Sequence, residues 1–88
     1  MDFVRLDRAD TVVTSTRSLS IGTLVDGVST TALIPSGHKV ATTQMGLGDP
    51  VRKYAQLIGY ASSNIMPGDH VHTHNVDFRN TAMEYEFS

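Results

Sequence analysis

Three histidines near the end of the 88-residue chain are spaced by two residues: His70, His72 and His74. If this segment is a β-strand, side chains two residues apart share a face, so the three imidazoles point one way. Val71 and Thr73 then point the other way, and Val71 is expected to face the core. A core of this size leaves little room for three histidines. We therefore predict that the imidazole face is exposed, or covered by something outside this chain.

A His-x-His pair on a strand is also suited to metal binding. Its α-carbons lie about 6.6–6.8 Å apart, and two imidazoles can converge on one zinc ion at about 2.0–2.1 Å each. Iron and other divalent ions accept imidazole as well. His72 and His74 are thus the predicted metal ligands. Only two carboxylates lie nearby, those of Asp69 and Asp77, which predicts an incomplete site that a partner completes. Two alternatives stay open: plain solvated histidines, or donors to a substrate carboxylate.

Five further residues are candidates for contacts with a substrate or an interface. His38 and Lys39 follow a glycine, where they could reach a substrate carboxylate or a partner's surface. They could equally be a turn residue and a solvated strand residue. Lys53 could steer an acidic substrate, and His70 belongs to the histidine row. Asn75 could hold a ring orientation, cap a strand end or simply occupy a turn. No residue is assigned as the catalytic base, and no phosphate-binding loop or Gly-x-Ser-x-Gly motif is present.

These side chains must be positioned by a recurrent turn. The pattern Gly-x-x-Val occurs four times, and an apolar residue precedes each copy: Ile21, Ile34, Leu47 and the Ile65-Met66 pair. The pattern predicts a tight turn at the glycine, followed by a strand whose valine points inward. The four copies are Gly22-Thr23-Leu24-Val25, Gly37-His38-Lys39-Val40, Gly48-Asp49-Pro50-Val51 and Gly68-Asp69-His70-Val71.

The rest of the pattern also favours strands. Short apolar segments alternate with Gly or Pro every eight to twelve residues or so, as in proteins made of many short strands. Helices would have to avoid three prolines and seven glycines. We therefore expect a mainly β fold with at most one or two short helical turns, the best candidate being residues 42–45. One domain is expected over residues 1–76, with residues 77–88 as a tail or the start of a linker.

Composition excludes several classes of function. There is no Cys, so disulfides and thiolate metal sites are excluded. Lys and Arg total 7 against 9 Asp and Glu, and these charges are scattered, so no basic stripe is present for a nucleic acid. No apolar run approaches the roughly 20 residues of a membrane span. The expected protein is soluble and cytoplasmic.

Four segments together resemble the SAF-type domain of the altronate/galactarate dehydratase family. They carry the family's pattern of apolar-Pro-x-Gly-His-Lys, Gly-x-x-Val-x-Lys-Tyr, Ile-Gly and Pro-Gly-x-x-Val-His-x-His-Asn. In this chain the segments are residues 34–41, 48–54, 58–59 and 67–75, and the resemblance extends over residues 10–75. The sequence departs from the family at Arg52, Ala55 and Tyr60, where an aliphatic residue, a glycine and a basic or small residue are usual.

The resemblance implies a compact β-clip fold and a share in the metal-assisted dehydration of sugar acids such as altronate or galactarate. In that chemistry a proton is removed next to a carboxylate, an enediolate is held by a divalent metal, and the β leaving group departs. It implies iron(II) or manganese(II), shared with a large catalytic subunit or domain that carries most of the machinery. Without that partner this chain is expected to be inactive.

Other functions stay open. A related branch of the family eliminates sulfite from sulfolactate and uses this domain as a separate small subunit. SAF-type folds also serve as non-catalytic modules that bind carbohydrate or ice, a role that the hydroxyl-rich residues 11–31 would suit. A domain that only assembles the enzyme, including as a homo-oligomer, is the third possibility.

Overall fold

The computed structural model describes residues 3–5, 7–54 and 56–77, and every regular element within them is a β-strand. The expected mainly β, single-domain fold is confirmed. In the same part of the chain no helix is long and apolar enough to span a membrane. The strands are β1 (Phe3–Val4), β2 (Val12–Ser15), β3 (Leu24–Val25), β4 (Val28–Ser29), β5 (Lys39–Ala41), β6 (Pro50–Lys53), β7 (Gln56–Ala61), β8 (His70–Val71) and β9 (Val76–Asp77).

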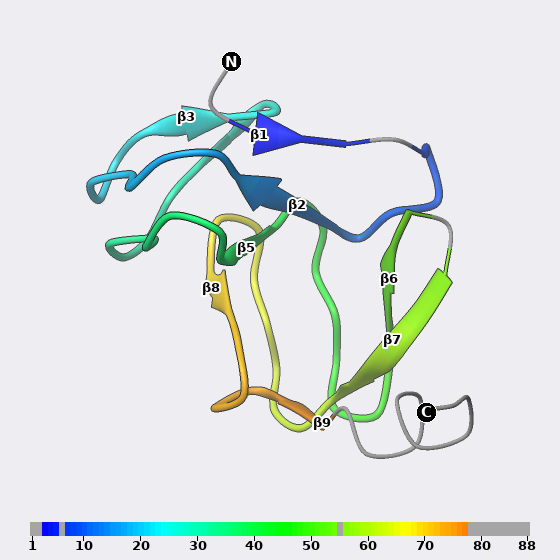
Figure 1. Ribbon diagram of the computed structural model, residues 1–88. Helices are drawn as coiled ribbons and strands as arrows, with labels where there is room; N and C mark the ends of the chain where they lie inside the picture. Colours follow the sequence, from blue (N-terminus) through cyan, green and yellow to red (C-terminus); the bar gives the residue numbers. More distant parts are fainter. Residues whose placement is uncertain (1–2, 6, 55, 78–88) are drawn as a thin grey trace.

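The strands form three antiparallel sheets (Figure 1). The largest has the order β1-β2-β5-β8, the second has the order β6-β7-β9, and β3 and β4 form a hairpin. Within the largest sheet β5 lies between β2 and β8, and Val40 of β5 pairs with His70 of β8. This register brings together two segments about thirty residues apart in the sequence, and it positions the site described below.

The Gly-x-x-Val pattern is part of a longer repeat of eleven residues, found at 15–25, 30–40, 41–51 and 61–71. In each unit the first residue is small or carries a hydroxyl, the fifth is a large apolar residue, the eighth is glycine and the eleventh is valine. All four glycines have φ between +84° and +94°, as the third residue of a type II turn requires. All four valines have 0% exposure. The predicted turn and the inward valine are therefore confirmed in every copy.

The units associate in two pairs by reciprocal backbone hydrogen bonds. In the first pair the Gly22 N–H donates to Thr30 O at 2.9 Å, and the Gly37 N–H donates to Ser15 O at 3.0 Å. In the second pair the Gly48 N–H donates to Ala61 O and the Gly68 N–H donates to Ala41 O, at 2.8 and 2.7 Å. The fifth residues also pair across each couple, Leu19 with Ile34 and Met45 with Ile65. The two units of each pair are thus related by an approximate two-fold relation, since each donates the same backbone hydrogen bond to the other.

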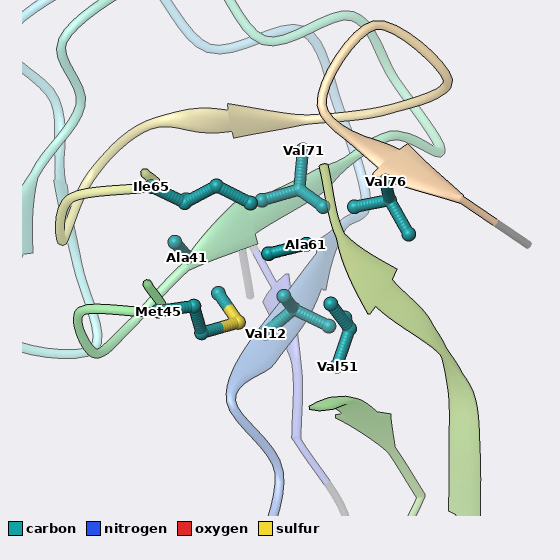
Figure 2. Packing of buried hydrophobic residues seen from close by; sticks show 8 residues of the cluster. All are labelled: Val12, Ala41, Met45, Val51, Ala61, Ile65, Val71 and Val76. Carbon is teal, nitrogen blue, oxygen red and sulfur yellow. The ribbon is translucent and has the colours of Figure 1, made fainter. Parts of the chain in front are cut away.

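Each pair of units encloses its own apolar cluster. One consists of Val13, Leu19, Val25, Ile34 and Val40. The other, in which the eight side chains converge between the strands (Figure 2), consists of Val12, Ala41, Met45, Val51, Ala61, Ile65, Val71 and Val76. Neighbouring residues of β2, Val12 and Val13, point to opposite faces of the sheet, so this strand contributes to both clusters.

Two of the apolar residues that precede the motif, Ile21 and Leu47, are 69% and 72% exposed. They directly precede the turn glycine, at a corner that points to solvent, and the buried residue stands three positions before the glycine. The prediction of a helical turn at residues 42–45 is wrong. Met45 and Ile65 exchange backbone hydrogen bonds at 2.9 and 2.7 Å, and this pairing requires an extended backbone at Met45. The predicted boundary between the domain and its tail lies after residue 76, inside strand β9 (Val76–Asp77). The rest of the predicted tail, from residue 78 onward, lies outside the described residues.

Candidate functional site

Four histidines gather on one face of the molecule. Nδ1 of His38 and Nε2 of His70 are joined by a hydrogen bond of 2.8 Å. The ring of His38 also stacks on that of His72, with 4.4 Å between centroids, and the ring of His74 lies 5.2 Å from that of His70. His38, His70 and His72 are half-buried and His74 is exposed. The rings therefore cluster at the surface, outside both apolar clusters.

The three histidines spaced by two do not share one strand, as the sequence analysis expected. β8 ends at Val71, and the chain then turns back into β9. The N–H groups of Asn75 and Val76 both donate to His72 O at 3.1 Å, which closes this turn. Val71 is buried as predicted, but Thr73 is exposed because it lies in the turn rather than on an inward strand face.

His38 joins the cluster because two repeat units meet there. It is the ninth residue of the second unit, directly after the turn glycine and the first residue before β5. His70 is the tenth residue of the fourth unit and opens β8, which pairs with β5. The sequence analysis named His38 as a contact residue but did not place it with the other histidines. The places of His38 and His70, one and two residues after a turn glycine, were the available signal.

Asn75 fixes the loop that carries His72. Its side chain is 7% exposed, and both ends of its carboxamide are used. The His72 N–H donates to Asn75 Oδ1 at 3.0 Å, and Asn75 Nδ2 donates to His70 O at 2.9 Å. Among the interpretations left open by the sequence, the structure thus gives Asn75 the role of a clamp between backbone groups on either side of Val71.

Replacing Asn75 by alanine is expected to cost about 1–3 kcal/mol of unfolding free energy, because the partly buried N–H of His72 and carbonyl of His70 would lose the side chain that they bond. Asn75→Asp should cost at least as much, since a carboxylate oxygen would then face the carbonyl of His70. Urea denaturation measures both. Asn64→Ala is the matched control: Asn64 is exposed and accepts a 3.2 Å hydrogen bond from the Leu47 N–H. Equal losses at both asparagines would contradict the clamp.

The cluster is electrostatically unfavourable to further positive charge. The pKa of His70 is lowered by burial and then by His38 and the other imidazoles. The pKa of His72 is lowered by desolvation, by His38 and by the ammonium group of Lys39. The hydrogen bond between His38 and His70 also requires one ring nitrogen without a proton. The neutral forms of His70 and His72 are therefore favoured, and neutral imidazole is the form that binds metals.

Two lysines extend this face. Burial lowers the pKa of Lys39, and the charge of Lys53 lowers it further, so the two ammonium groups act on each other. Nζ of Lys53 lies 4.8 Å from the centroid of the Tyr54 ring. Lys39 acts in turn on His72. The positive charge of Lys39 near the imidazoles suits an anionic group, such as a carboxylate.

The ring nitrogens that lie within 4.8 Å of one another belong to His38, His70 and His72. His74, which the sequence analysis paired with His72 as a metal ligand, is not in this set. Of the two carboxylates considered earlier, Asp69 accepts hydrogen bonds from Thr31 Oγ1 at 2.6 Å and from the Met66 N–H at 2.9 Å. Within the described part of the chain, the group that can hold an ion thus consists of imidazoles alone.

Comparison with known proteins gives a consistent picture. A family model for the altronate/galactarate dehydratase SAF domain matches residues 1–79. Altronate dehydratase of Escherichia coli (strain K12) is 35% identical over 79 residues, and that of Bacillus subtilis (strain 168) is 34% identical over 77. These alignments cover 85% and 83% of this chain. The chain spans only 16% of the length of either dehydratase.

A second kind of relative is shorter. Subunit alpha of the (2R)-sulfolactate sulfo-lyase of Paracoccus pantotrophus is 50% identical over 42 residues. That alignment covers 48% of this chain and 63% of the subunit.

Proposed function

Since this chain belongs to the altronate/galactarate dehydratase SAF domain family, we propose that it is the SAF component of a lyase that removes water from a sugar acid. One observation carries the proposal: four imidazoles gather at the surface, where an acid could bind, and the ammonium group of Lys39 is near enough to lower the pKa of His72. A carboxylate would accept hydrogen bonds from ring N–H groups and a charge-assisted one from the ammonium group. The substrates we propose are altronate and galactarate, and the place of action is the cytoplasm.

The rest of the active site belongs, in this proposal, to a larger catalytic subunit or domain. The chain matches only 16% of the length of the altronate dehydratases, which supports a division of labour. The cluster itself is half-exposed, so a covering partner would exclude water from it. We assign to the partner the base that removes the proton next to the substrate carboxylate. This chain then orients the acid and completes the pocket.

A divalent metal, iron(II) or manganese(II), belongs to the same proposal. The donor set fits such a group, because three imidazole ring nitrogens lie within 4.8 Å of one another. His38, His70 and His72 would hold the ion, and the partner would supply the remaining ligands. A bound ion would supply Lewis acidity toward substrate oxygens. Lys39 and the N–H groups of this face would meanwhile hold the carboxylate in place.

The sulfo-lyase relative favours a second candidate function. Its alpha subunit matches this chain at 50% identity over 42 residues, and the match covers 63% of that subunit. The alternative is therefore that this chain is the small subunit of an enzyme that eliminates sulfite from sulfolactate. Both reactions expel a leaving group next to a carboxylate-bearing carbon, so the same face would serve either one. A non-catalytic carbohydrate-binding or assembly role is the third candidate.

Reconstitution tests these candidates. The chain is combined with a large dehydratase chain encoded by the same genome, and altronate, galactarate and sulfolactate are assayed with iron(II) or manganese(II). We expect turnover of a sugar acid only when both chains are present, because each carries part of the site. The large chain alone and the 88-residue chain alone are the controls. Sulfite release would select the second candidate, and full activity of either chain by itself would refute the division of labour.

A further inference from the structure

The β3–β4 hairpin and the stem that leads into it present an apolar surface that the substrate site does not use. We propose that the large catalytic chain docks on this surface. That chain is itself part of the proposed function, on which this proposal rests, and the new element is the place where the two bind. The surface, called here the hairpin face, consists of Ile21, Leu24 and Leu33, with Met66 at its border.

Three large aliphatic side chains of the hairpin face project into solvent. Ile21, Leu24 and Leu33 are 69%, 73% and 60% exposed. Leu24 directly precedes Val25 and Leu33 directly precedes Ile34, and both of these neighbours are buried in the same apolar cluster. Adjacent side chains of an extended chain point to opposite sides. Leu24 and Leu33 therefore both point away from that cluster, on the outer side of the paired segments.

Charge is nearly absent from this part of the surface. Residues 18–37 contain a single charged residue, Asp26, although 18% of the whole chain is charged. The carboxylate of Asp26 is paired with Arg5, whose Nη1 lies 2.8 Å away. Depletion of charged residues is the compositional mark of the core of a protein–protein interface. Exposed aliphatic side chains gathered on such a surface indicate that another protein covers it.

The hydroxyl groups between these side chains are bonded within the hairpin. Thr23 Oγ1 and Thr30 Oγ1 both donate to the carbonyl of Ser20, at 2.6 and 2.9 Å. The Thr23 N–H donates to Thr30 Oγ1 at 2.9 Å. Because these polar groups already have partners, covering them with another protein costs little desolvation. The same bonds fix the conformation of the segment, so little ordering is needed on association.

The hairpin face continues toward the imidazole cluster. Thr31 donates from its N–H to Gly68 O at 3.0 Å and from its hydroxyl to Asp69 Oδ1 at 2.6 Å. These two residues directly precede His70, and Met66, which is 49% exposed, lies in the same turn. In Figure 1 both β3 and β8 lie on the side of the molecule away from β6 and β7. A protein seated on the hairpin face would therefore also reach the histidines.

The large catalytic chain is the occupant that these observations favour. This chain spans only 16% of the length of the two altronate dehydratases, so most of each relative lies outside the matching part. A partner that covers the imidazole cluster has to bind beside it, and the hairpin face is the neighbouring surface suited to burial. Since this face lacks charge, we expect the partner to meet it with an apolar, uncharged surface of its own.

A matched pair of variants tests the docking surface. Ile21 and Leu47 both directly precede a turn glycine, in different pairs of repeat units, and are 69% and 72% exposed. Ile21→Asp should weaken binding to the large chain about a hundredfold or more, because an unpaired carboxylate would be buried against an apolar surface. Leu47→Asp should bind as the unmodified chain does. Titration calorimetry of the full 88-residue chain with the large chain used for reconstitution measures both affinities.

A second variant controls for folding and for the sign of the charge. Leu33→Lys places a positive charge on the hairpin face and should weaken binding to a similar extent. Circular dichroism and proton–nitrogen correlation spectra of the variants should match those of the unmodified chain, since the changed side chains are exposed. If Ile21→Asp does not fold, Leu33→Lys takes its place against Leu47→Lys. Tighter binding of Leu33→Lys would show that the partner offers a negative charge there, and would contradict apolar docking.

Several results would overturn the proposal. One is unchanged affinity of Ile21→Asp, and another is an equal loss of affinity in Leu47→Asp. Absence of any association between the two chains would do the same. The isolated chain should be a monomer in size-exclusion chromatography with light scattering. A dimer that Ile21→Asp dissociates would show that a second copy occupies the hairpin face instead.

The outcomes also separate the docking surface from the proposed function. Association that Ile21→Asp abolishes, without turnover of altronate, galactarate or sulfolactate, would support the docking surface and refute the lyase role. Turnover by a complex in which Ile21→Asp and Leu33→Lys bind normally would refute the docking surface and leave the proposed function standing.

Discussion

Gly68→Ala is expected to leave the chain largely unfolded at room temperature. Gly68 has φ of +94°, and a Cβ added to it would overlap the carbonyl oxygen of Ser29 and lie 3.0 Å from the carbonyl carbon. The obstacle is backbone, which cannot turn aside as a side chain can. Gly68 O also accepts the Thr31 N–H at 3.0 Å, a bond that links the two pairs of repeat units. Moving the chain to admit a methyl group would break this junction.

The magnitude follows from the size of the domain. At roughly 0.05–0.15 kcal/mol per residue, a chain of 88 residues has a total stability of about 4–13 kcal/mol. A backbone overlap at the contact between the two halves is expected to exceed the lower end of that range. Gly22→Ala is the matched control, because its φ is +85° and nothing lies within 4 Å of the added Cβ. It should cost only about 1–2 kcal/mol, the strain of a left-handed residue.

Circular dichroism, proton–nitrogen correlation spectra and urea denaturation of the two variants provide the measurement. Dispersed resonances and a sigmoidal transition are expected for Gly22→Ala, and collapsed spectra for Gly68→Ala. Similar stability of the two variants would show that the close approach of Gly68 to Ser29 does not hold the two halves together.

The comparison of these glycines shows how far the sequence could predict the fold. Gly-x-x-Val indicated a turn and an inward valine in all four copies, because a positive φ and an apolar strand residue are local properties. The close packing of Gly68 on Ser29 was invisible, since Gly22 and Gly68 carry the same motif. Pairing of the units is likewise made by backbone groups, which leave no side-chain signature.

At the candidate site, too, local features could be predicted from the sequence and long-range contacts could not. The sequence named every histidine of the cluster and predicted that the imidazoles would stand outside the core. It assumed a continuous strand, because His-x-His-x-His alternates as a strand does. The buried Asn75 ends that strand, by clamping backbone groups of His70 and His72, and the side chain of Asn75 three residues after His72 was the signal for a turn. The approach of His38 depended on the pairing of β5 with β8, which is a long-range contact.

The second large effect is expected for His72→Ala in the reconstituted two-chain enzyme. The ring of His72 stacks on His38, and the charge of Lys39 lowers the pKa of His72, so His72 belongs to the face that we assign to the substrate carboxylate. Removing one group that positions or stabilises the reacting acid typically costs about 10²–10³ in kcat. We expect a loss of that size in kcat/KM for the sugar acid. The fold should survive, because the bond of the His72 N–H to Asn75 involves only backbone on the His72 side.

Three readouts separate a role in the reaction from a role in assembly. Thr73→Ala, an exposed neighbour in the same turn, should retain the turnover of the unmodified enzyme. Association of His72→Ala with the large chain, followed by size-exclusion chromatography, should be unchanged, because one half-buried ring is a small part of an interface. Turnover is then measured at saturating large chain, where weaker association no longer matters. If His72→Ala recovers full kcat under that condition, the cluster serves only to join the two chains, and the dehydratase site must lie elsewhere.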